Sequence, residues 1–474
     1  MTRELCLSRA RFSTYRKPAW RIRIRAWSGI ALGAFGRLPC NETRVAAMNV
    51  RLAYGQGWLP VELPDRTTTV LEPAPRRGLA DEKAAVLDAV RHPVGTRPLR
   101  EHIRPDSHLC IVFTDLTRPT PNQRLIPWLI EEISSVPHRQ ITLVNSTGTH
   151  RPNTRRELRR LLTPQVAAGY RVVNHDCRDE GRLVPLGTTR DGTPALINRI
   201  VLEADVRLVT GFIEPHFFAG FSGGPKGLFP GCAGLATVMS NHGARNLGDP
   251  RATFGVTDGN PLWEELRDLA LRVGPSFLVN VSLNDRRQIT GVFAGDLVAA
   301  HRTGCEFVRQ AAMQPVDALF DIVVTTNSGH PLDLNLYQGI KGLSAGARIL
   351  KPGGLLILAC ECREGTPAGS SFDRLLRSAT GPEELLARIA SPGFQAPEQW
   401  QAQIQALIQR RARVRLHSTL SEEAVRAAHL ESCPDIAGAV RDELARLGPD
   451  ARVAVLPQGP LTIPYLAATA RPAA

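Results

Sequence analysis

Residues 206–231 read VRLVTGFIEPHFFAGFSGGPKGLFPG, and this stretch decides how the rest of the chain is interpreted. Its first part, Val206 to Phe212, is a short apolar run typical of a buried strand. The run leads to Glu214-Pro-His216, and the glycines and prolines that follow are too frequent for a regular helix or strand. We therefore predict a strand that delivers His216 and Lys226 into a shaped loop, the kind of segment that often carries chemistry.

Three earlier apolar runs end in the same way, with polar residues directly after the strand. They are His108 to Thr114 before Asp115-Leu-Thr-Arg118, Gln140 to Asn145 before Ser146-Thr-Gly-Thr-His150, and Tyr170 to Val173 before Asn174-His175-Asp176. Helical patterns separate them, at Asn122 to Ser134 and at about Thr154 to Leu162 with Asn153 as the expected cap. In open parallel sheets, ligands bind beyond the carboxyl ends of the strands. We expect Asp115, Arg118, His150 and His216 to converge there.

A second α/β segment begins near Ala318. It contains a strand from Leu319 to Thr325, a helix from Leu334 to about Leu343, and a strand from Gly354 to Ala359. Gln338 and Lys341 are three residues apart in this helix and share one face. Residues 363–445 are predicted to be mostly helical, with a last strand starting at Val453 that returns to the first domain.

These patterns predict an α/β protein with two α/β domains, parallel-type sheets and a cofactor and substrate cleft between them. The N-terminal domain spans residues 48–315 and is completed by residues 451–470, and the C-terminal domain spans residues 316–450. Residues 1–47 form a basic extension, for which two interpretations remain open. Either the start is mis-assigned, so that Met48 is the true first residue and residues 1–47 are disordered, or the extension is an Arg-rich targeting segment.

Composition narrows the class of protein. Of the net charge of +13, the first 47 residues carry +8 (ten Lys or Arg against Glu4 and Glu42), which leaves +5 for the remainder. That remainder needs no polyanion, so we expect no nucleic-acid partner. No apolar run reaches the ~20 residues of a membrane span, so no membrane association is expected. The nine cysteines are scattered without paired spacing, which favours a reducing, cytoplasmic setting.

Lys226 stands out because lysine is rare in this chain. Only five of the 58 basic residues are lysine, so the sequence uses arginine wherever a positive charge suffices. A site that needs a primary amine able to deprotonate or acylate cannot use guanidinium. Lys226 is thus a candidate amine nucleophile or attachment point, against the alternative of an ordinary surface lysine.

Several common chemistries do not match the Gly-rich loop. A P-loop requires Gly-Lys-Ser/Thr, but Lys226 lies between Pro225 and Gly227, and the glycine spacing does not form a dinucleotide fingerprint. His216 and His242 are 26 residues apart, and neither belongs to a Glu-x-x-His pair of ligands, which argues against a hydrolytic zinc site. Two histidines on either side of a substrate, with Arg118 or Lys341 holding an anion, would suit the two-faced proton transfer of racemases and epimerases.

The motifs together resemble those of the nickel-dependent lactate racemase family, from about Met48 to the end of the chain. They occur in the family's order as Asp115-Leu-Thr-Arg118-Pro, Gly148-Thr-His150-Arg-Pro, Glu214-Pro-His216 through Gly-Gly-Pro-Lys226 to Asn241-His242, and Leu336-Tyr-Gln338-Gly-Ile-Lys341-Gly. The resemblance implies a racemase or epimerase of lactate or a related 2-hydroxy acid, acting by reversible hydride transfer through a 2-keto acid. It also implies cofactor-synthesis enzymes as partners.

The resemblance further implies a cofactor and a role for each site residue. The cofactor is a nickel-pincer nucleotide, pyridinium-3,5-bisthiocarboxylic acid mononucleotide, attached covalently to Lys226 with His242 as a nickel ligand. His150 and His216 are implied as the acid/base pair, one for each enantiomer. The residues implied to hold the substrate are Arg118, Gln338 and Lys341. Asp115 is implied to lie at the cofactor site and to steer Arg118. Trp400 is either an aromatic residue of the substrate pocket or a core residue.

Two other classes remain to be weighed. A non-catalytic protein that binds or stores the nickel cofactor would not need both His150 and His216. A cofactor-independent α/β hydrolase would carry a serine or acidic nucleophile, and the sequence contains no Gly-x-Ser-x-Gly.

Overall fold

The computed structural model describes residues 46–467 of the chain. The basic extension predicted for residues 1–47 falls almost wholly outside this range, so its nature stays a prediction. Within residues 46–467, no helix combines the length and the apolar character needed to cross a bilayer.

The first large sheet has six strands in the order β13-β12-β9-β4-β5-β6, and all neighbours are parallel except β12 and β13. Its strands are β4 (Leu109–Thr114), β5 (Ile141–Ser146), β6 (Arg171–Asn174), β9 (Val206–Phe212), β12 (Phe277–Leu283) and β13 (Ile289–Asp296). Strand β4 reads LCIVFT and is buried on both faces, which explains its unbroken apolar run. The four strands predicted from sequence here are confirmed to within one residue at each end, whereas β12 and β13 were missed.

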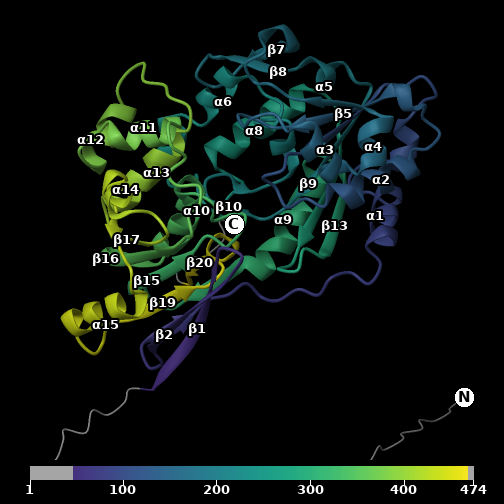
Figure 1. Cartoon of the computed structure of the whole chain (residues 1–474). Helices are drawn as coiled ribbons and strands as arrows, with labels where there is room; N and C mark the ends of the chain where they lie inside the picture. Colours follow the sequence, from purple (N-terminus) through teal and green to yellow (C-terminus); the bar gives the residue numbers. More distant parts are fainter. Residues whose placement is uncertain (1–45, 468–474) are drawn as a thin grey trace, which may run out of the picture. The chain divides into compact units, whose positions relative to one another are not determined.

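Helices cover both faces of this sheet. One face packs against α1 (Glu82–Arg91), α2 (Asn122–Glu132), α3 (Arg155–Leu162) and α4 (Pro164–Gly169), which lie together in Figure 1. The other face lies under α5 (Arg199–Glu203), α8 (Pro261–Arg272), α9 (Ala299–Ala312) and the Gly-rich segment. The cap of α3 is Thr154 and not the predicted Asn153, because Thr154 and Glu157 exchange side chain to backbone hydrogen bonds in a capping box.

The second large sheet is parallel throughout, in the order β18-β17-β16-β15-β19-β3. Its strands are β3 (Thr68–Val70), β15 (Phe320–Thr326), β16 (Leu350–Ala359), β17 (Arg413–His417), β18 (Glu431–Ser432) and β19 (Val453–Leu456). Its helices are α10 (Leu336–Ala347), α11 (Ser371–Arg377), α12 (Pro382–Ile389), α13 (Gln399–Gln409), α14 (Glu422–Ala427) and α15 (Ile436–Leu447). Two helix-covered sheets of parallel type confirm the predicted fold class.

Segments near both ends of the described chain contribute to the second sheet or pack on it. The hairpin β1 (Ala47–Tyr54) and β2 (Gly57–Pro64) packs with α15 on one face of it, and Figure 1 shows this purple hairpin beside the yellow β19. Strand β19 pairs with β15, which belongs to the predicted C-terminal domain, and with β3, which belongs to the predicted N-terminal domain. That residues 451–470 complete the first domain therefore stays a prediction. An apolar pattern predicts a strand but not its pairing partner, which here lies far away in sequence. The other domain boundaries stay predictions.

Shorter elements connect the two sheets and surround their edges. They are the strand pairs β7 (Leu183–Thr188) with β8 (Pro194–Asn198), β10 (Pro215–His216) with β11 (Gly220–Phe221), and β14 (Met313–Val316) with β20 (Ile463–Leu466). The short helices are α6 (Leu235–Asn241) and α7 (Ala244–Gly248), and the 3-10 turns are η1 (Leu99–His102), η2 (His138–Gln140), η3 (Glu180–Arg182), η4 (Gly224–Gly227) and η5 (Gly459–Leu461).

Each sheet has one point at which successive strands are added on opposite sides, and the loops at both points line one cavity. In the first sheet, β5 lies on one side of β4 and β9 lies on the other. In the second sheet, β16 lies on one side of β15 and β19 lies on the other. Loops that leave neighbouring strands at such a point diverge and leave a crevice for a ligand. The residues after these strands, including Asp115, Glu214, Asn327 and Pro460, all line the same cavity.

Candidate active site

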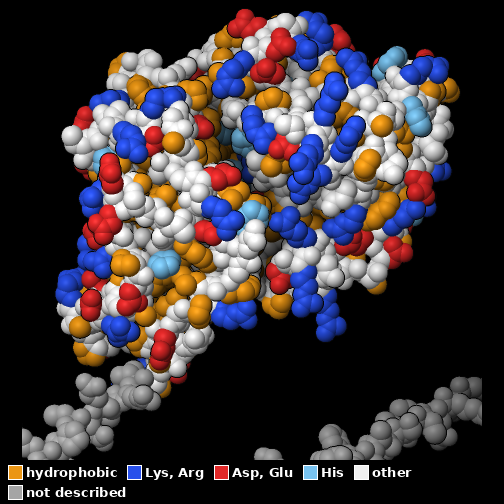
Figure 2. Space-filling model, viewed as in Figure 1, with side chains coloured by type: hydrophobic (Ala, Val, Ile, Leu, Met, Phe, Trp, Pro, Cys, Tyr) orange, Lys and Arg blue, Asp and Glu red, His pale blue; other side chains and the backbone are white. Residues whose placement is uncertain are grey.

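Every site residue singled out from the sequence lines one cavity, with a volume of about 180 Å³. These residues are Asp115, Arg118, His150, His216, Lys226, His242, Gln338, Lys341 and Trp400. Figure 2 shows the surface hollowed here, with pale blue histidine side chains visible inside the hollow. The fold therefore brings together residues that are spread over 286 positions, from 115 to 400, while their individual roles stay predictions.

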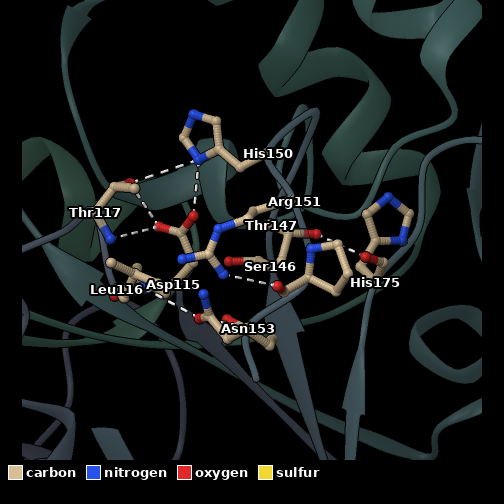
Figure 3. Close-up of polar contacts among 12 residues, drawn as sticks. Asp115, Leu116, Thr117, Ser146, Thr147, His150, Arg151, Asn153 and His175 are labelled. Carbon is tan, nitrogen blue, oxygen red and sulfur yellow. Dashed lines mark hydrogen bonds and ion pairs between the residues drawn. The ribbon is translucent and has the colours of Figure 1, made fainter. Parts of the chain in front are cut away.

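The Asp115 carboxylate fixes the orientation of His150. Its Oδ2 lies 2.7 Å from Nδ1 of His150, and its Oδ1 accepts hydrogen bonds from the hydroxyl (2.7 Å) and the backbone N–H (3.2 Å) of Thr117, as Figure 3 shows. Burial alone would raise the pKa of Asp115, but His150, the charge of Arg118 and Thr117 together outweigh it and lower that pKa. Asp115 is therefore a carboxylate that contacts His150.

The predicted role of Asp115, steering Arg118, stays a prediction. Its carboxylate bonds to His150 and Thr117, and it interacts with Arg118 through their opposite charges and through the backbone bond from the Arg118 N–H to the Asp115 carbonyl (3.2 Å). Asp115 contacts both residues because Arg118 lies in the turn that begins at Asp115, whereas His150 arrives from the neighbouring strand β5.

A network of asparagines holds the loops after β4, β5 and β6 together. The Asn145 amide nitrogen donates to the side-chain oxygens of Asn153 (2.9 Å) and Asn174 (2.8 Å), and Asn153 also accepts the Leu116 N–H at 3.2 Å. The sequence analysis missed this network, although three asparagines near successive strand ends were a visible signal. The network anchors the loop that carries His150.

His216 has a different environment from His150. Its Nδ1 accepts the backbone N–H of Ala219 at 3.2 Å, and its ring packs on Phe217 and edge-on to Phe218. Burial holds the pKa of His216 well below its usual value, and the nearby positive charges, of which Lys226 has the largest effect, lower it further. His216 is therefore a neutral imidazole.

Glycines let the segment around Lys226 lie close to its supports. Gly224 has a φ of 56°, and a Cβ there would lie 2.4 Å from the ring of His301. The Gly224 N–H donates to Asn280 Oδ1 at 2.8 Å, and Nε2 of His301 lies 2.9 Å from the Ser222 carbonyl. Asn280 and His301 thus shape the loop, and the sequence analysis did not identify either of them.

Lys226 faces the cavity as a weakly basic amine. Its Nζ lies 5.7 Å from the centre of the Phe218 ring and has no hydrogen-bond or ion-pair partner within residues 46–467. Burial, followed by the charges of Arg118 and Lys341, lowers the pKa of Lys226 to about 7. A large fraction of this amine is deprotonated near neutral pH, which is the form that attacks electrophiles.

His242 carries a buried ring nitrogen without a partner. The residue is 5% exposed, and its Nδ1 has no hydrogen-bond partner in the described part of the chain. The ring is held edge-on by Phe218 (5.0 Å) and Trp400 (5.2 Å), and Trp400 in turn donates its Nε1–H to the Tyr337 hydroxyl at 2.9 Å. Burial and the charge of Lys226 lower the pKa of His242 to about 3. A neutral imidazole with a free lone pair can bind a metal.

The opposite wall of the cavity offers groups that can hold an anion. Asn335 caps α10, and the helix places Gln338 and Lys341 one turn apart, with the Lys341 Nζ donating to Gln338 Oε1 at 2.7 Å. Burial and Arg118 lower the pKa of Lys341 to about 7, against the opposing effect of Glu214. Burial raises the pKa of the Glu214 carboxyl, a cavity residue that the sequence analysis left without a role.

Comparison with known families matches both halves of the chain. The family model of the lactate racemase N-terminal domain matches residues 54–255, and that of the lactate racemase C-terminal domain matches residues 316–463. Two similar proteins are named lactate racemase. That of Thermoanaerobacterium thermosaccharolyticum is 32% identical over 418 residues, 87% of this chain and 98% of the relative. That of Lactiplantibacillus plantarum is 33% identical over 418 residues, 86% of this chain and 98% of the relative.

Solved structures agree with these matches. The lactate racemase apoprotein of T. thermosaccharolyticum superimposes with a TM-score of 0.83 at 32% identity, covering 88% of this chain and all of the other. A Thermotoga maritima protein shares the fold alone, with a TM-score of 0.63 at 18% identity over 81% of this chain and 98% of its own. The chain belongs to the lactate racemase family.

Proposed function

We propose that this protein is a racemase or epimerase of a 2-hydroxy carboxylic acid, lactate or a related acid, that works with a nickel-pincer nucleotide. The observation that carries the proposal is the presence in one cavity of two histidines, a lysine amine of lowered pKa and a further histidine with an unpartnered buried nitrogen. The names of the two curated relatives support lactate as the first substrate to test.

Two of the cavity residues, Lys226 and His242, fit such a cofactor. Lys226 offers a primary amine that can form an amide with a carboxyl-type group, and His242 offers its unpartnered imidazole as a nickel ligand. Imidazole is a suitable ligand for nickel, so His242 would hold the metal of such a cofactor. When bound, the cofactor supplies a reversible hydride acceptor, which amino-acid side chains cannot provide.

The remaining cavity groups suit a 2-hydroxy acid. The guanidinium of Arg118 and the amine of Lys341 can pair with the carboxylate, and Gln338 can bond to the hydroxyl group. The α-hydrogen of such an acid is a very weak acid, so a histidine does not remove it as a proton at a useful rate. Loss of the hydroxyl proton to a histidine, together with loss of hydride from the α-carbon, gives a bound 2-keto acid. Return of hydride to its other face inverts the configuration.

We also infer the partners and the cellular location of the protein from the proposed cofactor and from the sequence. A covalently held nucleotide requires synthesis enzymes as partners, and the substrate is a small molecule. The scattered cysteines favour a cytoplasmic location. Asp115, which contacts His150, stays a proposed cofactor-binding residue, and Trp400, whose ring lies edge-on to His242, stays a proposed substrate-binding residue.

The decisive experiment is to coexpress the chain with cofactor-synthesis enzymes and to measure nickel content and intact mass. The wild type is expected to gain the mass of the cofactor. Lys226→Arg keeps the charge but cannot form the amide, so it should fold without the added mass. Lys351→Arg is the matched control, since Lys351 is an exposed lysine that pairs with Asp321. Unchanged cofactor mass in Lys226→Arg would sink the assignment.

The substrate is then identified by screening chiral 2-hydroxy acids in deuterated water. Retention of the α-hydrogen during racemisation supports hydride transfer, whereas complete exchange with solvent favours an enolate route. The alternative, a protein that stores the cofactor without turning over a substrate, predicts full loading and no racemisation of any acid in the panel.

A further inference from the structure

Asn280 is a cavity residue whose side chain is only half used by the fold. It lies in β12, is 0% exposed and lines the cavity. Its Oδ1 accepts the Gly224 N–H at 2.8 Å, whereas its Nδ2 has no hydrogen-bond partner within residues 46–467. A side-chain amide nitrogen carries two hydrogens that can be donated, so Asn280 has unused donor capacity beside the cavity.

The contact with Gly224 fixes which end of the Asn280 amide is the donor. A backbone N–H only donates, so the amide atom that faces it must be the oxygen. A flipped amide would place two donors against each other and is excluded. Gly223, with a φ of 78°, also lies against this oxygen, because a Cβ there would be 2.3 Å from Oδ1. Nδ2 is therefore the atom on the other side of the amide group.

Gly211 keeps space open beside Nδ2. Gly211 and Asn280 are partners in the parallel pairing of β9 and β12, and both line the cavity. A Cβ at Gly211 would lie 3.2 Å from Nδ2, so any larger residue would press on the amide nitrogen. A glycine inside a strand weakens the strand and often marks a place where a ligand approaches closely. The glycine in this buried strand thus leaves the Asn280 donor accessible.

Other polar groups of the same wall are already engaged within the fold. Three lining hydroxyl groups each donate to a backbone carbonyl, at 3.0, 2.7 and 3.0 Å, in Ser146, Thr147 and Thr210. Within residues 46–467, two side-chain amide nitrogens are buried without a partner, those of Asn153 and Asn280, and of these two only Asn280 lines the cavity. Buried donors without a partner are rare in native proteins, so this one indicates a ligand.

We propose that Asn280 binds the nickel-pincer nucleotide, with Nδ2 donating a hydrogen bond to an oxygen of that cofactor. The proposal rests on the proposed function. Asn280 suits the cofactor better than the substrate, because its oxygen holds Gly224, two residues before the proposed attachment point Lys226. The proposed substrate-holding groups lie elsewhere, on α10 and after β4. The acceptor is an oxygen of the phosphate or of a carboxyl-derived group on the ring, since both accept hydrogen bonds from an amide.

The two ends of the Asn280 amide then join the loop to its ligand. The oxygen holds the backbone of the Gly-rich segment, and the nitrogen holds the cofactor that Lys226 of this segment is proposed to carry. Loss of the donor alone is therefore expected to weaken cofactor binding while the loop keeps its anchor.

Coexpression with cofactor-synthesis enzymes tests this expectation with Asn280→Asp. Aspartate keeps the shape and an acceptor for the Gly224 N–H, but it replaces the donor with an oxygen. We expect a smaller fraction of Asn280→Asp than of wild type to gain the cofactor mass, and a smaller rise in thermal midpoint on loading. Asn284→Asp is the matched control, since Asn284 lies in the turn after β12, does not line the cavity and bonds to the Arg76 carbonyl. It should load like the wild type.

Gly211→Ala is an independent variant that leaves the bond between Asn280 and Gly224 intact. Gly211 is not among the residues with positive φ, so alanine fits its backbone, and the added methyl group occupies the space beside Nδ2. We expect reduced loading here too. If the wild type gains no cofactor mass, the proposed function fails and this proposal with it. If the wild type loads, and both variants match it in loaded fraction and in thermal midpoint, only the present proposal is refuted.

Titration of the cofactor-free chain identifies the acceptor. The probe is nicotinic acid mononucleotide, a pyridinium mononucleotide with a ring carboxylate and a phosphate, and binding is measured by isothermal titration calorimetry. Its Kd should be about tenfold to a hundredfold higher for Asn280→Asp than for the wild type, because a hydrogen bond to a charged acceptor is lost. Inorganic phosphate and nicotinate are then titrated separately, and the acceptor belongs to the one whose affinity falls in the variant. Equal affinities of the mononucleotide for wild type and Asn280→Asp would overturn the proposal.

Discussion

The two walls of the cavity differ in how their side chains are held. On the wall built by the first sheet, His150 and His216 are each fixed by a hydrogen bond to a group that cannot change its role, the Asp115 carboxylate and the Ala219 backbone N–H. On the wall built by the second sheet, Gln338 and Lys341 bond to each other across one turn of α10. Fixed orientation suits bond making and breaking, whereas a pair that can open to receive an anion suits binding.

Under the proposed roles, the reactive nitrogens all come from the first sheet, on loops anchored by asparagines and by the packed Gly-rich segment. The proposed substrate-holding groups come from both sheets, because Arg118 follows β4 whereas Gln338 and Lys341 lie on α10. Changes to the reactive nitrogens of the first wall should therefore lower kcat or cofactor loading, and changes to the holding groups of the second should mainly raise KM.

The largest effect is expected from Asp115→Asn. The carboxylate accepts a hydrogen bond from Nδ1 of His150, so Nε2 of the neutral ring is an acceptor. The asparagine amide can donate toward His150 and permit the other tautomer, so the Nε2 acceptor is lost while the shape is kept. We expect kcat to fall by about three to four powers of ten, as happens when a histidine is held in the wrong tautomer. Racemisation rates and the 15N shifts of His150 measure this, and intact mass should show normal cofactor loading. A fall in KM or loading alone, with kcat preserved, would break the comparison.

A smaller effect is expected from Lys341→Met, which keeps the length of the side chain but removes the amine that pairs with the substrate carboxylate. KM should rise by about tenfold to a hundredfold, with a lesser change in kcat, because a charged hydrogen bond contributes about 1.5–3 kcal/mol. Initial rates over a range of substrate concentrations measure both constants. Lys351→Met, on the exposed side of the second sheet, is the control. A loss confined to kcat would place Lys341 among the reacting groups.

The smallest effect is expected on the stability of the protein without cofactor. Burial lowers the pKa of Lys226 from 10.5 to about 7, so between these values the unfolded chain binds more protons than the folded one. Stability should therefore rise as pH increases from 7 toward 10, and the penalty should be complete below pH 7. Lys226→Met removes the buried charge, so its thermal midpoint at pH 6 should exceed that of the wild type by a few degrees.

Thermal unfolding of both proteins across this pH range checks the sign. The excess of Lys226→Met over the wild type should shrink as pH rises, because the wild-type amine becomes neutral. If the thermal midpoints of the two proteins differed equally at pH 6 and pH 10, Lys226 would not be desolvated in the folded state. The conclusion that Lys226 is a weakly basic amine would then be wrong.

The sequence by itself determined the strands that carry the site and the residues at their ends. Runs such as β4 and β9 are buried on both faces, and burial demands an unbroken apolar pattern that is readable without the fold. The same logic exposed the loop around Lys226, since no regular element tolerates so many glycines and prolines. These local signals were sufficient because each depends on residues that are close together in the chain.

Tertiary structure alone decided which groups meet. Asp115 reaches His150 from the neighbouring strand, Asn280 supports Gly224 from β12, and β19 joins the second sheet instead of the first. None of these contacts leaves a local pattern, because strand order and the registry of loops depend on partners far away in sequence. The sequence identified the two histidines, but only the fold shows that Nδ1 of His150 contacts a carboxylate whereas Nδ1 of His216 accepts a backbone N–H.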